Sequence, residues 1–121
     1  MKNRHLIDSF KCAFRGVIQT FKSERNFKIH ILATIIVMIL AWYMEINSTE
    51  YITLVITISI VLISELFNTA IEYTVDLVCG NNYSELGKYA KDIAAGATLV
   101  AALGAVVVGC IIFLPKITDI F

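Results

Sequence analysis

Four polar residues that could carry chemistry recur at helical spacing within residues 64–76, at the end of a long apolar run. They are Glu65, Asn68, Glu72 and Asp76, separated by three, four and four positions. At ~100° per residue these positions share one face of a helix and spread over roughly 16 Å of its axis. Carboxylate and amide oxygens without a nearby Cys or His cluster favour Mg²⁺ over zinc. Because Mg²⁺ is usually held by one or two carboxylates together with substrate phosphates, this acidic face points toward a nucleotide.

Glu65 is the acid that lies furthest into the apolar run, since positions 51–63 carry no charge. A carboxylate at hydrocarbon depth is costly and marks a functional site by default. Two other interpretations stay open at this point: a polar cluster that pairs helices in a structural oligomer, and an oligomeric proton or ion pathway. A proton relay needs neither the Lys91–Asp92 pair that follows nor Glu24, so these residues distinguish it from an enzyme.

The loop after the acidic face offers groups for phosphate but none of the common phosphate-binding motifs. The sequence contains neither a Walker A motif nor GxGxxG. Lys91 can instead meet a phosphate as a point charge. Asp92 either caps the start of the last helix or helps to hold a ligand or metal ion.

Three apolar runs must position these groups, at residues 29–44, 51–71 and 94–114. A spanning helix needs roughly 20 apolar residues, which the second and third runs supply and which flanking residues complete for the first. Residues 1–121 therefore predict a single all-α integral membrane domain with spans at about 28–46, 50–77 and 92–114. The alternative of buried soluble helices fits poorly with three such runs in 121 residues, 58% of them hydrophobic.

An amphipathic segment at about residues 4–23 precedes the spans. We expect a helix lying in the membrane interface, with its basic face toward the lipid head groups. The apolar residues at helical spacing are Leu6, Ile7, Phe10, Phe14, Val17, Ile18 and Phe21.

The distribution of Lys and Arg predicts the orientation. Seven of the ten lie within residues 1–28, and Lys88 and Lys91 lie in the loop between the last two runs. We expect the protein in the plasma membrane. By the positive-inside rule, the N-terminus and the 77–92 loop are cytoplasmic and the C-terminus is outside.

Small residues recur at every fourth position of the last span, at Ala97, Ala101, Ala105 and Gly109. Such a stripe lets helices approach closely in lipid, and three helices alone give little shelter to acids, so we expect an oligomer. The formal net charge of zero indicates no nucleic-acid partner. The three cysteines are far apart and form no CxxC pair, which argues against a zinc site or a disulfide framework. We expect Pro115 simply to follow the last helix.

Several motifs together resemble the prokaryotic integral-membrane diacylglycerol kinase family. The pattern E-x-x-N-x-A-I-E-x-x-V-D runs from Glu65 to Asp76, A-K-D ends at Asp92, F-R-G begins at Phe14, and SERNFKIH carries Glu24. The resemblance covers nearly the whole chain. ERNFKIH and the closing FLPKITDIF are most similar to the Gram-positive branch, whose members act as undecaprenol kinases.

The resemblance implies a homotrimer with active sites between protomers at the cytoplasmic interface, using ATP and Mg²⁺. The acid matching Glu65 is the family's proposed general base, and those matching Glu24 and Glu72 hold metal with the nucleotide. The other positions that match the family's site are Asn68, Asp76, Tyr83, Lys91 and Asp92. Two positions depart from the best-studied branch: Cys12 replaces an aromatic residue that contacts the nucleotide, and His5 replaces an early arginine.

The predicted reaction is the transfer of a phosphoryl group from ATP to a membrane lipid alcohol, most simply undecaprenol, which gives undecaprenyl phosphate. Diacylglycerol, which gives phosphatidic acid, is the alternative acceptor. Glu65 accepts the hydroxyl proton in this scheme, while Mg²⁺ and Lys91 neutralise phosphate charge.

Overall fold

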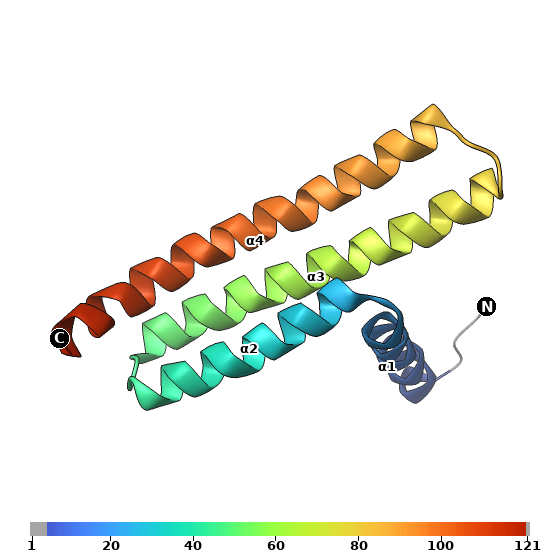
Figure 1. The fold of residues 1–121 in the computed structure, drawn as a ribbon. Helices are drawn as coiled ribbons and strands as arrows, with labels where there is room; N and C mark the ends of the chain where they lie inside the picture. Colours follow the sequence, from blue (N-terminus) through green and yellow to red (C-terminus); the bar gives the residue numbers. More distant parts are fainter. Residues whose placement is uncertain (1–4, 121) are drawn as a thin grey trace.

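The described part of the chain is built of long helices. A computed structural model describes residues 5–120 and contains, within that range, four helices: α1 (Leu6–Ser23), α2 (Arg25–Tyr43), α3 (Ser48–Cys79) and α4 (Glu85–Ile120). Figure 1 shows α3 and α4 as a long antiparallel pair, with α2 running along the first half of α3. α1 lies across the start of α2, and the α3–α4 turn extends well beyond it.

Three helices, α2, α3 and α4, are long and apolar enough to cross a membrane. The prediction of an all-helical chain with three candidate spans is therefore confirmed. With 32 and 36 residues, α3 and α4 are about 48 and 54 Å long at 1.5 Å per residue. Both exceed the ~30 Å thickness of a bilayer's hydrocarbon core, so either helix, if it crossed the core upright, would extend beyond it.

Two expectations about the ends of α4 were wrong. The helix begins at Glu85, so Asp92 lies two turns inside it and does not cap it. Ser84 takes that place, because its Oγ accepts a hydrogen bond from the Gly87 N–H at 3.1 Å. At the other end, Pro115 lies inside the helix, which continues to Ile120 although proline supplies no N–H to the helical ladder.

α1 and α2 are joined by a one-residue interruption of the helix rather than by a loop, and this junction is called the α1–α2 break. The predicted start of this helix near residue 4 lies outside the described residues, and the helix begins at Leu6. Glu24 alone separates α1 from α2, and its extended backbone (φ −112°, ψ 115°) turns the chain between the two helices. Apolar side chains of α1 are exposed, including Leu6, Phe10 and Phe14.

A buried apolar cluster lies beside the α2–α3 turn, eleven residues of α3 before Glu65. Its buried members are Ala41, Ile46, Leu54, Ile112 and Phe113. The turn is fixed by a capping box in which Asn47 Oδ1 accepts from the Glu50 N–H at 2.9 Å and Glu50 Oε1 accepts from the Asn47 N–H at 3.1 Å. Glu50 Oε1 also lies 3.3 Å from Lys116 Nζ, which ties α3 to α4.

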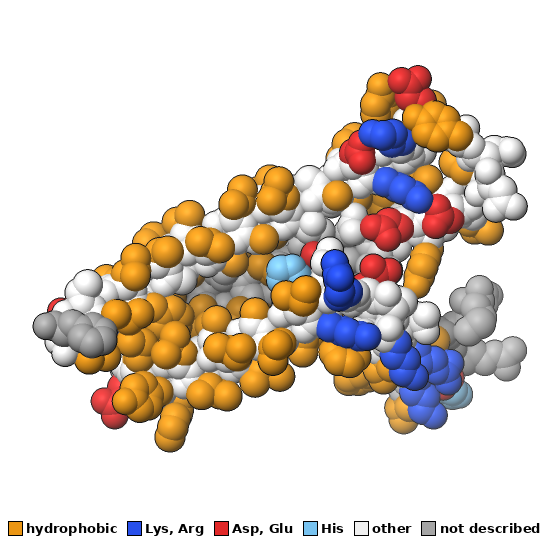
Figure 2. Space-filling view, viewed as in Figure 1, with side chains coloured by type: hydrophobic (Ala, Val, Ile, Leu, Met, Phe, Trp, Pro, Cys, Tyr) orange, Lys and Arg blue, Asp and Glu red, His pale blue; other side chains and the backbone are white. Residues whose placement is uncertain are grey.

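Polar and apolar side chains divide the molecule along its length. In Figure 2 hydrophobic side chains cover the half built by α2 and the facing parts of α3 and α4, while charged side chains gather on α1 and the α3–α4 end. Large hydrophobic residues are exposed along α2 and α4, including Ile36, Ile39, Val100 and Ile111.

Three of the four positions of the small-residue stripe of α4 line cavities beside α2 or α3 of the same chain, although Ala97 itself is exposed. Ala105 and Gly109 line a cavity together with residues of α2 and α3, and Ala97 lines another beside Asn68 of α3. Because these small residues adjoin α2 and α3 of the same chain, the stripe by itself is no longer an argument for an oligomer.

Candidate active site

Glu65 is the buried acid of the molecule's middle. It lies on α3 with 5% of its surface exposed, one turn before the buried Thr69, whose hydroxyl donates to the Glu65 carbonyl at 3.0 Å. The α2 residue His30 reaches it: His30 Nε2 lies 3.3 Å from Glu65 Oε1. A buried carboxylate thus has a nitrogen partner from a different helix.

Glu24 joins this region from the break between α1 and α2. Its N–H donates to the Thr20 carbonyl at 2.9 Å, which closes the last turn of α1 and directs Glu24 out of the helix. Burial raises the pKa of the Glu24 carboxyl above its ordinary value, and the negative charges of Glu72 and Glu65 raise that pKa further. The fold therefore brings three acids, from two separate segments, within electrostatic reach of one another.

Asn68 and Glu72 form the next step along the same face of α3. Asn68 Nδ2 donates to Glu72 Oε1 at 3.1 Å, one helical turn away. Asn68 Oδ1 is buried and has no hydrogen-bond partner within the described structure. Since a buried amide oxygen without a donor is costly, this atom fits a hydroxyl group, a metal-bound water or a cation that comes with the substrate.

The donor set fits Mg²⁺ as an incomplete site. Within residues 5–120, no group of three or more His, Cys, Asp or Glu side chains converges as a complete metal centre. Mg²⁺ does not require one, because one or two carboxylates suffice when substrate phosphates supply further oxygens. Glu24 and Glu72, which repel each other across the break, together with the unpartnered Asn68 oxygen, match that description.

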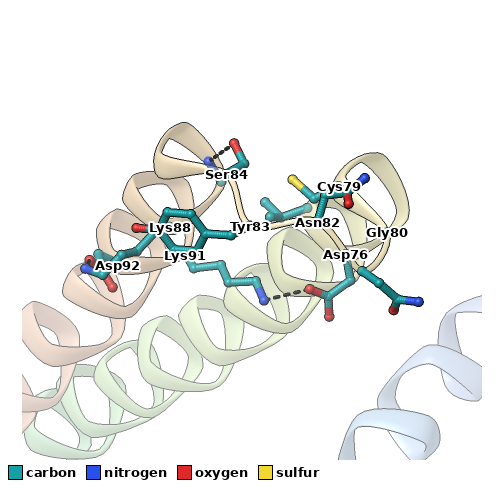
Figure 3. Close-up of a pocket in the computed structure, with 12 residues that line it drawn as sticks. Asp76, Cys79, Gly80, Asn82, Tyr83, Ser84, Lys88, Lys91 and Asp92 are labelled. Carbon is teal, nitrogen blue, oxygen red and sulfur yellow. Dashed lines mark hydrogen bonds and ion pairs between the residues drawn. The ribbon is translucent and has the colours of Figure 1, made fainter.

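A second cluster lies at the α3–α4 turn, where a cavity of about 420 Å³ opens. Lys91 Nζ reaches from α4 to Asp76 Oδ1 on α3 at 2.6 Å, as Figure 3 shows, and Lys88 Nζ pairs with Asp92 Oδ2 at 2.8 Å. Tyr83 also lines the cavity and is 81% exposed. The cavity thus combines two cations, two acids and an exposed aromatic ring.

Two glycines allow this turn. Gly80 follows α3 with a φ of +59°, a region that residues with a Cβ adopt only with strain. Gly87 lies so close to α3 that an added Cβ would stand 3.0 Å from Cys79 Sγ and 3.1 Å from Val75 Cγ1. Close packing at Gly87 therefore sets how near Lys88 and Lys91 come to α3.

The predicted site residues fall into two groups along α3. Glu24, Glu65, Asn68 and Glu72 lie together at the α1–α2 break. Asp76, Tyr83, Lys91 and Asp92 lie at the turn, and Asp76 is eleven positions, or roughly 16 Å of helix, beyond Glu65. Lys91 links the groups, because its charge interacts with Glu72 as well as with Asp76. The catalytic and binding roles assigned to these residues remain predictions.

Sequence reasoning missed His30. It was visible only as a histidine near the start of the first apolar run, because the 3.6-residue period relates positions on one helix and says nothing about partners on another. The one available signal was an ionisable residue in an apolar run, which calls for a partner.

Comparison with known proteins assigns the chain to a family. The family model "Prokaryotic diacylglycerol kinase" matches residues 11–113. The chain belongs to the prokaryotic diacylglycerol kinase family. The matched range holds the acids of α3, the break at Glu24 and the α3–α4 turn. The family and the names of the relatives below identify it as a lipid kinase.

Three relatives illustrate the range of similarity. A diacylglycerol kinase of Synechocystis is 41% identical over 116 residues, which are 96% of this chain and 66% of the relative, so the chain spans about two thirds of that protein. An undecaprenol kinase of Bacillus subtilis is 41% identical over 109 residues, 90% of this chain and 88% of the relative. A diacylglycerol kinase of Escherichia coli is 29% identical over 100 residues, 83% of this chain and 81% of the relative.

Proposed function

We propose that this family member transfers the γ-phosphoryl group of ATP to the hydroxyl of undecaprenol, giving undecaprenyl phosphate and ADP. The observation that carries the proposal is the buried Glu65 on a face that continues through Asn68 and Glu72 to the charged cavity at the turn. One end of this face suits a substrate that stays in lipid, and the other suits one that arrives from water. The similarity to the undecaprenol kinase of Bacillus subtilis supports this acceptor, and diacylglycerol remains the alternative.

The helix lengths support a membrane position in which Glu65 lies near one boundary. From Ser48 to Glu65, α3 rises about 26 Å, close to the ~30 Å of a hydrocarbon core. If α3 enters the bilayer at its N-terminal end, Glu65 is near the opposite boundary, and the remainder of α3 projects into water with the α3–α4 turn. In this position Glu65 is close enough to the aqueous side to meet the phosphates of ATP.

The protein is proposed to lie in the plasma membrane in the orientation that the basic residues predict. The N-terminus and the 77–92 loop are in the cytoplasm, and the C-terminus is outside. α1 then lies in the interface, where its exposed apolar side chains, such as Phe10 and Phe14, enter the lipid. ATP reaches the cavity at the turn from the cytoplasm.

Each group has a task that follows from its position. Glu65 accepts the proton of the lipid hydroxyl as the oxygen attacks the γ-phosphorus, and the P–O bond to ADP breaks. Asn68 Oδ1 accepts a hydrogen bond at the reaction centre, and Lys91 draws the phosphates toward α3. Tyr83, Asp76 and Asp92 line the nucleotide cavity.

Glu24 and Glu72 are the proposed Mg²⁺ ligands, together with oxygens of ATP. The metal ion, when bound, neutralises charge on the phosphate oxygens. Without a cation the two carboxylates repel each other, and this accounts for the raised pKa of Glu24 in part.

We propose a homotrimer with sites shared between protomers. Two observations support it. The chain resembles a family of homotrimers, and in a single chain the cavity at the α3–α4 turn is open to solvent, with its lining residues Asp92 and Tyr83 exposed. Mixed oligomers test it at an ATP concentration well below the native KM, where Lys91→Met is slow. If Glu65 and Lys91 of one site come from different protomers, coexpressed Glu65→Gln and Lys91→Met chains exceed the average turnover of the two variants, whereas sites within one chain give only that average.

A competition assay tests the acceptor. The purified chain receives ATP labelled in its γ-phosphate with undecaprenol and diacylglycerol at equal surface fraction in mixed micelles. We expect label mainly in undecaprenyl phosphate. A strong preference for diacylglycerol would overturn the acceptor but keep the kinase, while absence of label in both lipids would contradict the proposed reaction.

A further inference from the structure

His30 is a polar partner that α2 supplies to the buried Glu65 side chain. His30 Nε2 and Glu65 Oε1 are 3.3 Å apart, with the His30 side chain 26% exposed and that of Glu65 only 7%. The two residues are 35 positions apart, on α2 and α3. This contact has no place in the reaction scheme above, so its purpose needs an explanation.

A general base must present one carboxylate oxygen to the hydroxyl in a fixed direction. The last torsion of a glutamate side chain is broad and roughly two-fold, so packing at the Cγ alone does not fix its oxygens. A donor that holds one oxygen leaves the other oriented. Histidine Nε2 carries an N–H in the charged form and in one neutral tautomer, so either form can supply a donor at the observed 3.3 Å separation.

We propose that His30 is a positioning residue for the phosphoryl transfer: its Nε2–H holds Glu65 Oε1 and so aims Oε2 at the acceptor hydroxyl. The inference rests on the proposed role of Glu65 as the base. His30 touches neither ATP nor lipid in this scheme and acts only through Glu65.

The surroundings of His30 favour orientation over simple packing. His30 lines an apolar cavity of about 150 Å³ whose other lining residues, Val37, Leu54 and Phe113 among them, carry no charge. A large aliphatic residue would fill that space better than a ring that requires a polar partner. α3 contributes Glu65 to this contact, the α1–α2 break contributes the charge of Glu24 near Glu65, and α4 contributes only uncharged groups to the cavity.

Two substitutions separate the N–H donor from the rest of the ring. Glutamine places its amide Nε2 at the same number of bonds from Cα as histidine Nε2, and it donates without ever carrying charge. Leucine keeps the bulk and removes the donor. We expect His30→Leu to lower kcat by about 10- to 100-fold, the loss typical of a misaligned catalytic group, with KM for ATP and for lipid within about twofold. His30→Gln should restore kcat to within about threefold of the native chain.

Val37→Ala is the matched control, because Val37 lines the same cavity on the same helix without reaching Glu65. We expect it to lower the midpoint of thermal unfolding but to keep kcat. If Val37→Ala lowers kcat as much as His30→Leu does, packing explains both and the proposal fails. The proposal also fails if His30→Leu keeps native kcat, or if His30→Gln is as slow as His30→Leu.

The Glu65→Gln background keeps this inference distinct from the proposed function. Because His30 acts only through Glu65, adding His30→Leu to Glu65→Gln should not lower the residual turnover further. Native turnover in Glu65→Gln alone would overturn the base assignment itself. If Glu65→Gln is inactive while His30→Leu turns over normally, the base assignment stands and only the role of His30 is lost.

Discussion

The two ends of α3 carry acids in opposite circumstances. At the α2–α3 turn, Glu50 accepts a backbone hydrogen bond from Asn47 and lies against Lys116. In the other half, Glu24 and Glu72 meet as like charges, and the pKa of Glu24 is raised by burial and by that repulsion. The acid at the first end has a cation beside it, whereas Glu24 and Glu72 at the other end raise each other's electrostatic cost. The difference separates an acid that stabilises the fold from acids for which we propose a metal-binding role.

Exchanging Glu65 for glutamine should give the largest effect. Glu65→Gln keeps the shape but cannot accept a proton, so turnover should fall by about 10²- to 10⁴-fold while ATP and Mg²⁺ binding survives. The measurement is transfer of labelled phosphate to lipid, with nucleotide binding followed separately. Glu50→Gln is the matched control at the other end of α3, and it should retain kcat.

Removing either proposed metal ligand should act on the Mg²⁺ requirement. Glu24→Gln and Glu72→Gln should each raise the Mg²⁺ concentration for half-maximal activity by about tenfold or abolish activity, since a direct ligand is lost. Titration of activity with Mg²⁺ checks this. A variant with the native Mg²⁺ dependence would show that the substituted carboxylate is not a ligand.

Although Glu24→Gln should impair activity, it should stabilise the folded chain at neutral pH. An acid whose pKa is raised in the folded state adds stability at low pH and loses it as the pH rises through that pKa. At neutral pH the charged Glu24 therefore opposes folding, and its glutamine variant should unfold ~1–3 °C higher in the absence of Mg²⁺. The gain should shrink on acidification, because the native carboxyl becomes neutral as well. Glu50→Gln should instead unfold a few degrees lower. Equal shifts of the unfolding midpoint in the two variants would show that Glu50 and Glu24 do not differ in their effect on stability.

Lys91 should affect nucleotide binding more than stability. Its ion pair with Asp76 is largely exposed, and such pairs contribute little to folding. Lys91→Met should raise KM for ATP by about tenfold, which corresponds to the loss of one charge-assisted contact. KM for the lipid and the unfolding midpoint should change little. A change in KM for the lipid alone would contradict the proposed contact between Lys91 and ATP.

Gly87→Ala should give the smallest effect. The added Cβ would stand 3.0 Å from Cys79 Sγ and 3.1 Å from Val75 Cγ1, so these side chains of α3 must yield by a few tenths of an ångström. We expect a two- to threefold rise in KM for ATP and a slightly lower unfolding midpoint, both of order 1 kcal/mol or less. Gly104→Ala on the same helix meets no atom within 4 Å and serves as the control, with unchanged kinetics.

The site could be predicted from sequence to different depths along the chain. Glu65, Asn68 and Glu72 share a face because their spacing on one helix requires it. The location of Asp92 was harder, because a polar stretch before an apolar run hid seven helical residues, and the helix starts at Glu85 with Ser84 as its cap. The helical Pro115 was missed for a similar reason: local sequence favours a stop there, and the packed ends of α3 and α4, tied by Glu50 and Lys116, hold the helix together.

The sequence by itself determined the helical, membrane-suited character of the chain, the acidic face of α3 and the family, because apolar runs, helical period and motif are properties of neighbouring residues. Only the tertiary structure decided which groups meet across helices. It placed Glu24 at a one-residue break beside Glu65 and Glu72, set His30 against Glu65, and closed the turn so that Lys91 reaches Asp76. The reason is physical: these contacts depend on how far each helix slides and rotates against its neighbour. That is fixed by packing at Gly87 and in the apolar core rather than by any period along the chain.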